Sequence, residues 1–147
     1  MTPLWATLHF AGFAAWLGGL LAVLALRRGT TATPGEASPD LSAVYRALVG
    51  PGAMLTVVTG LMLTLRMYGE VTGDGFTRGL MAMQGLGLVA GMLSLIVSVP
   101  TASRLARLEP VGPSGALYRQ LDQRLRATDL IVLGLGLAAI VAGTLGR

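Results

Sequence analysis

The chain has no cysteine, and few of its 147 residues are charged. Without cysteine, disulfides, thiolate metal sites and thiol redox chemistry are excluded. Charged residues make up 12% of the sequence and hydrophobic residues 53%, whereas about a quarter of the residues in a soluble domain are charged. The mean hydropathy is positive, at +0.69. This composition predicts an integral membrane protein whose first partner is the lipid bilayer.

Lysine is also absent, so all 11 basic residues are arginines. A nucleic-acid surface needs basic residues clustered on a polar domain, with aromatic residues among them. The arginines here lie instead at the ends of apolar segments. We therefore interpret the net charge of +4 as a signal of membrane orientation and do not expect nucleic acid as a partner.

Four apolar segments approach or exceed the roughly 20 residues that cross a hydrocarbon core. They predict spans at residues 3–26, 49–68, 79–99 and 129–145. No domain boundary or soluble domain interrupts them. The predicted fold is a single all-α domain over residues 1–147, an integral membrane four-helix bundle with antiparallel, up-down-up-down helices.

The connections between the spans differ in character. Residues 27–48 begin with a Pro-, Gly- and Ser-rich loop and end in a short lead-in helix. The segment "GEVTGDGFTR" is short, so spans two and three should form a tight hairpin. Residues 100–128 contain Leu117, Leu121 and Leu125 at intervals of four. This spacing predicts an amphipathic helix that lies on the membrane surface or extends span four.

The arginines predict the orientation of the bundle. The first and third connections hold eight of them, whereas Arg66, Arg78 and Arg147 lie at the other face. By the positive-inside rule, both termini then lie outside the cytoplasm. We expect a multi-pass protein of a bacterial or archaeal inner (cytoplasmic) membrane.

The only histidine, His9, lies within the first span, about 9 Å below its outer end. Ionisable groups at such depth usually face the bundle interior or a cavity. Two interpretations stay open: a metal or cofactor ligand, or a neutral imidazole bonded to a neighbouring helix. Gly12, Trp16 and Gly19 share the face of His9 and leave room for a flat group or a close helix. Trp16 is a candidate cofactor contact, although ordinary core packing also explains it.

Side chains of spans two and three should reach the depth of His9. Met62 and Met83 are candidate ligands together with His9, either as an axial pair for haem iron or as a soft site for Cu(I). Methionine is also a common core filler. Arg66 is a candidate for binding haem propionates, and snorkelling to the interface explains it equally well.

Small residues recur at intervals of four in two of the spans. Gly134, Ala138, Ala142 and Gly146 form such a stripe in the fourth span, and Gly87 and Gly91 form another in the third. Stripes of this kind let membrane helices approach closely, so helix packing is sufficient to explain them. Charged pairs within the spans are missing, which argues against a channel or transporter. No set of side chains typical of hydrolytic catalysis is present, so redox chemistry would require a bound cofactor.

Three stretches resemble the HemJ-type protoporphyrinogen oxidases and the CopD-like copper-resistance membrane proteins, which share a four-helix layout. "LWATLHFAGFAAWLGGLLAVLAL" resembles their first helix, with its Leu-His pair followed by Trp and small residues. "VYRALVGPGAMLTVVTGLML" resembles their second helix, and "ALYRQLDQRLRATDLIVLGL" more loosely the approach to their fourth.

The resemblance implies a b-type haem held by His9. The HemJ-type enzymes carry a lysine in helix three, near the position of Met83 and Gln84 here, and a further histidine near Ser98. This chain has neither residue, so we expect haem binding and electron transfer without protoporphyrinogen oxidation. The alternatives are a copper-handling or copper-transport protein using His9, Met62 and Met83, and a cofactor-free structural subunit of a membrane complex. A redox partner or a second copy of the chain would be the protein partner.

Overall fold

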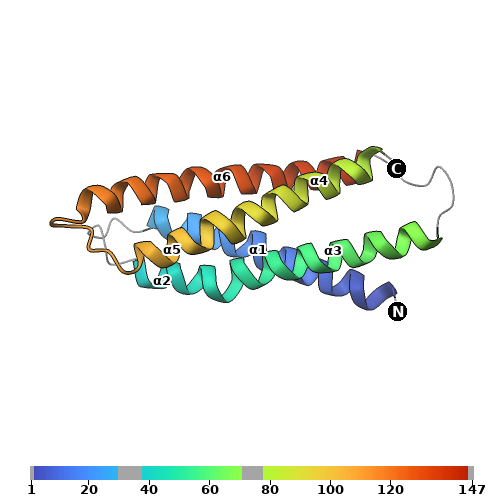
Figure 1. The fold of residues 1–147 in the computed structure, drawn as a ribbon, viewed down its shortest axis with the longest axis horizontal. Coiled ribbons are helices and arrows are strands. Elements are labelled where there is room, and N and C mark those ends of the chain that lie inside the picture. The colour runs from blue at the N-terminus through green and yellow to red at the C-terminus, as the bar shows by residue number, and fades with distance from the viewer. Residues whose placement is uncertain (1, 30–37, 71–77, 146–147) are drawn as a thin grey trace.

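The computed structural model describes residues 2–29, 38–70 and 78–145, and nearly all of these residues are helical. Four helical stretches are long and apolar enough to cross a membrane: Leu4–Arg27, Leu41–Arg66, Arg78–Leu105 and Gly115–Leu145. They lie side by side in an elongated bundle with both chain termini at the same end (Figure 1). The all-α class and the four apolar helices predicted from the sequence are confirmed.

The helices are longer than the predicted spans. Helix α1 covers Thr2–Gly29. The second stretch runs from α2 (Ser38–Val44) through a π-helical turn, η1 (Tyr45–Val49), into α3 (Gly50–Glu70). The third runs from α4 (Arg78–Leu93) through a second π-helical turn, η2 (Ser94–Ser98), into α5 (Val99–Leu105). Helix α6 covers Gly115–Leu145, so the predicted amphipathic segment extends the fourth helix rather than forming a separate one. The predicted loop at 30–37 and the connection at 71–77 lie outside the described residues.

Each π-helical turn ends just before a proline. In η1 the Gly50 amide donates to the Tyr45 carbonyl, five residues back, and Pro51 follows. In η2 the Val99 amide donates to the Ser94 carbonyl in the same way, and Pro100 follows. A proline ring clashes with the carbonyl four residues earlier in an α-helix, and the wider π turn relieves that clash. The helices therefore continue through both prolines instead of ending there.

Two helix pairs make up the bundle, α1 with α3 and α4 with α6 (Figure 1). The α1–α3 pair is held close by glycines. A Cβ atom at Gly52 would lie 2.6 Å from the backbone nitrogen of Trp16, and one at Gly12 would lie 2.9 Å from the backbone nitrogen of Thr56. Gly12 and Gly19 therefore make room for a close helix, one of the two uses expected of that face.

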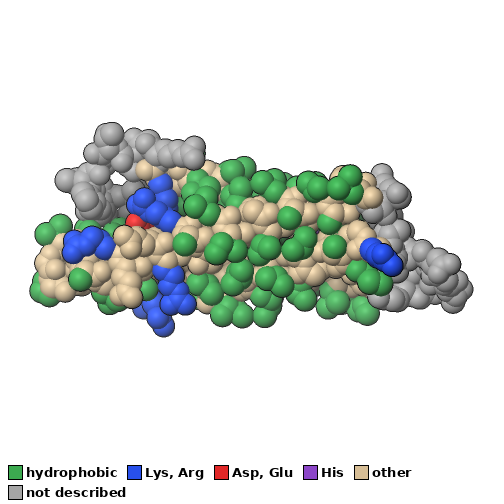
Figure 2. Space-filling view, turned by 90° about the horizontal axis from the view of Figure 1, so that it is seen from above, with side chains coloured by type: hydrophobic (Ala, Val, Ile, Leu, Met, Phe, Trp, Pro, Cys, Tyr) green, Lys and Arg blue, Asp and Glu red, His purple; other side chains and the backbone are tan. Residues whose placement is uncertain are grey.

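The bundle has two ends of different character. We call the end that contains α2, α5 and the start of α6 the arginine-rich end, and the opposite end, where both termini lie, the terminal end. Arginines gather near the arginine-rich end and apolar side chains cover the surface between the two ends (Figure 2). This apolar belt fits contact with lipid acyl chains.

The buried core lies mainly toward the arginine-rich end. Its fully buried members include Trp16, Leu20, Val23, Tyr45 and Val49. In contrast, no residue from Arg78 to Val89 is buried. The largest buried side chains thus lie in one half of the bundle, whereas the part of α4 up to Val89 lies at the surface.

The predicted small-residue stripes are only partly used for packing within the chain. A Cβ atom at Gly91 would collide with a methyl group of Val57, as expected of a close contact. Around Gly87 and Gly134, however, no atom lies within 4 Å of an added Cβ, and Ala138 is exposed. The close contacts of α6 come instead from Gly136, against Leu17, and from Gly143, against Met83. Gly146 lies outside the described residues.

Candidate functional site

His9 is bonded to the facing helix α3. Its Nδ1 lies 3.0 Å from the carbonyl oxygen of Thr56 and 3.1 Å from the hydroxyl of Thr59. A carbonyl oxygen can only accept a hydrogen bond, so Nδ1 must carry the proton and donate it. In the neutral imidazole Nε2 is then unprotonated and has a free lone pair. The bonded imidazole foreseen in the sequence is present, in the tautomer that metal ligation through Nε2 needs.

Gly60 lets the imidazole approach α3. A Cβ atom at this position would lie 3.0 Å from Cε1 of His9, closer than side chains normally pack. The Thr59 hydroxyl, in turn, donates to the carbonyl of Leu55 at 2.6 Å, which orients its oxygen to accept from His9. Three neighbouring positions on one face of α3 therefore fix the position and tautomer of the ring.

Trp16 lies deeper in the bundle on the same side of α1. Its side chain is fully buried, and its indole Nε1 donates to the hydroxyl of Ser94 at 2.9 Å. Ser94 belongs to η2, so this bond joins the α1–α3 pair to the α4–α6 pair. Trp16 therefore has the core-packing role that the sequence left open, and no contact with His9 is needed to explain it.

The remaining predicted site residues lie in separate contacts. Met83 packs its sulfur against Gly143 of α6. Met62 is 38% exposed and follows Gly60 by about 200° around α3, so it projects from a different face than the one bonded to His9. The guanidinium of Arg66 lies 5.9 Å from the centre of the Trp5 ring, a cation–π distance. Near them, Gln84 donates to Thr64 at 2.6 Å and so joins α4 to α3.

These positions allow one protein ligand to a haem iron but do not assemble a soft metal site. Haem brings four nitrogens of its own and requires only an axial ligand from the protein, which Nε2 of His9 can supply. Cu(I) needs several convergent soft ligands, and the sulfur of Met83 lies against another helix. Among the described residues, no group of three or more His, Cys, Asp or Glu side chains is placed to hold a metal ion.

A second polar cluster, which the sequence did not reveal, lies toward the arginine-rich end. Asp129 of α6 is fully buried within the fourth membrane-spanning stretch. The Tyr45 hydroxyl donates to its Oδ2, and the Ser98 hydroxyl donates to Oδ1 at 3.0 Å. Tyr45 comes from η1 and Ser98 from η2, so both π-helical turns contribute to this cluster. All three side chains are fully buried.

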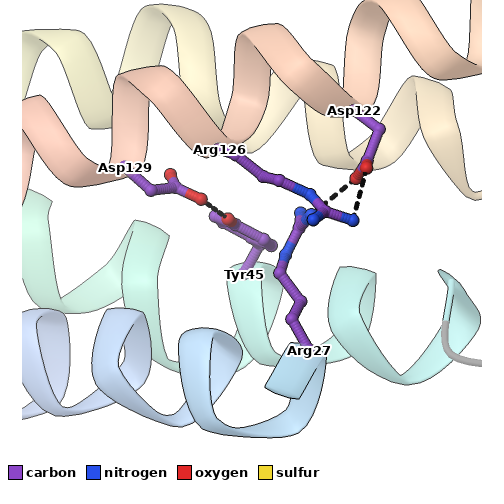
Figure 3. A network of polar contacts seen from close by, with 5 residues as sticks. All are labelled: Arg27, Tyr45, Asp122, Arg126 and Asp129. Carbon is purple, nitrogen blue, oxygen red and sulfur yellow. Dashed lines mark hydrogen bonds and ion pairs between the residues drawn. The ribbon is translucent and has the colours of Figure 1, made fainter. Parts of the chain in front are cut away.

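An ion-pair network adjoins this cluster (Figure 3). Arg27, at the end of α1, reaches Oδ1 of Asp122 at 2.5 Å, and Arg126 reaches Oδ2 of the same carboxylate at 2.8 Å. The side chain of Arg27 is only 8% exposed and that of Asp122 18%. Arg27 and Asp122 lie just outside the predicted spans 3–26 and 129–145, so this pair joins the ends of the first and fourth stretches.

Two sequence signals point to this cluster in retrospect. Asp122, Arg126 and Asp129 follow one another at intervals of four and three, which places them on one face of a helix. Ser94 and Ser98 are the two polar residues of the apolar run 85–99, which is followed by Pro100. Neither signal identifies Tyr45 or Arg27 as the partner, because those contacts bridge 84 and 95 residues of sequence.

Comparison of the chain with family models, with curated proteins and with solved structures finds no match in any of the three.

Proposed function

We propose that this protein is an integral-membrane haem-b protein that transfers electrons within the bilayer, with Nε2 of His9 as an axial ligand. The observation that carries the proposal is the hydrogen bond from Nδ1 of His9 to the Thr56 carbonyl. Metal-ligating histidines commonly donate their other ring N–H to a carbonyl or carboxylate, which fixes the tautomer and raises the basicity of the ligating nitrogen. A haem bound here would supply one-electron chemistry, which no side chain of this chain supplies by itself.

The chain's own residues do the binding and the orientation. Thr56 and Thr59 hold the imidazole, and the absence of a side chain at Gly60 gives it space. Arg66, at the terminal end and beside Trp5, is positioned near an interface where it can pair with a propionate. The stretch Arg78–Val89, in which no residue is buried, can yield to a large planar group more easily than the core can.

Copper handling is the weaker alternative. His9, Met62 and Met83 were the candidate ligands, and these side chains lie on three different helices in three different contacts. A copper site would require them to converge, whereas a haem site requires only His9. A structural subunit remains the third alternative, and the open face at Gly134 and Ala138 is the surface it would use.

The proposal also includes the orientation of the bundle and the kind of membrane that contains it. The arginine-rich end lies in the cytoplasm by the positive-inside rule, so His9 lies toward the outer face of a bacterial or archaeal inner membrane. The resemblance of the first two helices to HemJ-type proteins supports haem as the ligand. The lack of lysine supports electron transfer rather than protoporphyrinogen oxidation.

The test is the absorption spectrum and the metal content of the protein purified from membranes in detergent. We expect a Soret band, stoichiometric haem iron and no stoichiometric copper. The His9→Ala variant should lose the band while keeping the helical content of the wild type. Stoichiometric copper without haem would favour the alternative, and a protein with neither metal would contradict both.

A Met62→Leu and Met83→Leu pair serves as a matched control. Both substitutions conserve volume, so they preserve packing. If His9 is the only axial ligand from this set, both variants keep the full haem content. A changed spectrum in one of them would identify that methionine as a second ligand.

A further inference from the structure

Two aspartates on one face of α6 have partners of different chemistry. Asp122 receives its hydrogen bonds from the guanidinium groups of Arg27 and Arg126. A guanidinium only donates and stays charged, so it requires an ionised carboxylate. Asp129, two turns further along the helix, receives its hydrogen bonds from the hydroxyls of Tyr45 and Ser98. The two carboxylates therefore differ in how many protonation states their surroundings can satisfy.

Hydroxyl partners satisfy Asp129 in either state. A hydroxyl can rotate and both donate and accept. When Asp129 is ionised, Tyr45 and Ser98 donate to its two oxygens. When Asp129 is protonated, its own O–H can donate to one hydroxyl while the other still donates to it. A buried donor or acceptor without a partner is costly, and in neither state is a carboxyl oxygen of Asp129 left without a partner.

The guanidinium of Arg27, which adjoins this cluster, contains a buried donor. The Arg27 side chain is 8% exposed, yet its Nε–H is buried and has no hydrogen-bond partner among the described residues. Figure 3 shows Arg27 in the same polar network as Tyr45 and Asp129. A buried donor of this kind calls for an acceptor, and a water molecule is the smallest group that supplies one. Such a water would connect the cluster to the arginine-rich end of the bundle.

The charged and titratable groups around Asp129 are few. Arg27 approaches from α1, Tyr45 from η1, and Asp122 from α6 itself; η2 contributes the uncharged Ser98. Arg27 and Asp122 are paired with each other, so neither neutralises Asp129 by a direct ion pair. The carboxyl can therefore gain or lose a proton without breaking a salt bridge.

We propose that Asp129, Tyr45 and Ser98 form a reversible proton-binding site, supplied from the arginine-rich side through a water molecule at Nε of Arg27. The carboxylate of Asp129 takes a proton from hydronium, which leaves as water, and returns it by the reverse step. No electron moves, so the site goes beyond the proposed haem function and does not depend on it. Intramembrane carboxyl groups of this kind are typical of proton relays.

Infrared spectroscopy of the whole protein in lipid vesicles tests the proposal. The carbonyl stretch of a protonated carboxyl group is separate from that of a carboxylate, so it reports the protonation of Asp129 directly. Wild-type protein should show a protonated-carboxyl band that appears as the pH is lowered and disappears reversibly as it is raised. The isosteric Asp129→Asn variant should lose one component of this band, whereas the components of the other six Asp and Glu side chains remain. Glu109→Gln, at an exposed position, should keep the Asp129 component.

Two further variants keep the proposal testable if Asp129→Asn does not fold. Tyr45→Phe and Ser98→Ala each remove one hydrogen bond to Asp129, so each should shift the frequency of the Asp129 component and leave the components of the other carboxyl groups unchanged. A band that is unaffected by all three substitutions, or an Asp129 signal that does not respond to pH in the folded protein, would overturn the proposal. Lowering the pH only on the arginine-rich side of oriented vesicles should produce the band, and a response only to the opposite side would overturn the proposed route.

Discussion

The two halves of the bundle differ in packing and in the polar chemistry they contain. Toward the arginine-rich end, large side chains such as Trp16 and Tyr45 are fully buried, and salt bridges and hydrogen bonds join α1, η1, η2 and α6. Toward the terminal end, no residue from Arg78 to Val89 is buried, and the main polar contact of α1 is the bond of His9 to α3.

The half that contributes most to stability is therefore not the half that contains the candidate haem ligand. Core contacts and a buried ion-pair network make the arginine-rich half costly to disturb. Regions with fewer buried contacts open more easily, and ligand-binding regions are drawn from them. We therefore expect substitutions near the arginine-rich end to lower thermal stability and substitutions around His9 to change the haem spectrum.

Asp122→Ala should cause the largest loss of stability. It leaves the buried guanidinium of Arg27 without its carboxylate, and breaking a buried ion pair costs about 3 to 5 kcal/mol. Because the side chain of Asp122 is 18% exposed, we expect the lower end of this range. Thermal unfolding in detergent, followed by circular dichroism, measures the change. Glu109→Ala is the exposed control, and equal melting temperatures for the two variants would show that the network adds no stability.

Gly52→Ala should be the next most damaging change. The new Cβ would lie 2.6 Å from the backbone of Trp16, so α1 and α3 must move apart, and such overpacking costs about 1 to 3 kcal/mol. Gly134→Ala is the matched control, because no atom lies within 4 Å of its added Cβ and alanine favours a helix. A Gly134→Ala variant less stable than Gly52→Ala would place the close helix contact elsewhere.

Ser94→Ala should have a moderate effect on stability. It removes the acceptor of the Trp16 indole N–H, and a buried donor left unsatisfied costs about 1 to 3 kcal/mol. A double-mutant cycle with Trp16→Phe measures the coupling between the two side chains. We expect a coupling of about 1 kcal/mol, and additive effects would mean that the hydrogen bond is not formed.

Gly60→Ala should have the smallest effect on stability and a distinct effect on the spectrum. The new Cβ would lie 3.0 Å from Cε1 of His9, so the imidazole must shift while the core, farther along the bundle, is unchanged. Alanine favours a helix over glycine by about 1 kcal/mol, which offsets much of the overpacking cost, so we expect less than about 1 kcal/mol of destabilisation together with a lower haem content per folded protein. Absorption at the Soret band, normalised to protein, measures it. An unchanged spectrum with a large loss of stability would mean that the region around His9 contributes to stability and not to haem binding, which is the reverse of the expected contrast.

Much of the fold could be predicted from the sequence, because a membrane helix depends on local composition. The four apolar stretches are visible without any tertiary information, and so is the position of His9 within the first. The helix ends were less predictable. The third span was predicted to end at residue 99, whereas the π turn η2 lets the helix continue through Pro100 to Leu105.

The polar contacts could not be predicted in the same way. Helical periodicity shows which residues share a face of one helix but not which residue of another helix they meet. The depth argument placed Met62 and Met83 in the layer of His9, yet Met83 faces Gly143 and His9 faces Thr56. The partner of Asp129, Tyr45, depends on the rotation that η1 imposes on the second helix, which leaves no mark in hydropathy.

The most direct test of the central claim is a chemical rescue at His9. His9→Gly opens a space for free imidazole, which can enter as a replacement ligand while the rest of the chain is unchanged. We predict that this variant, purified without imidazole, lacks the Soret band of the wild type and regains it when imidazole and haemin are added. A His9→Gly protein with the full wild-type haem spectrum in the absence of imidazole would contradict the account.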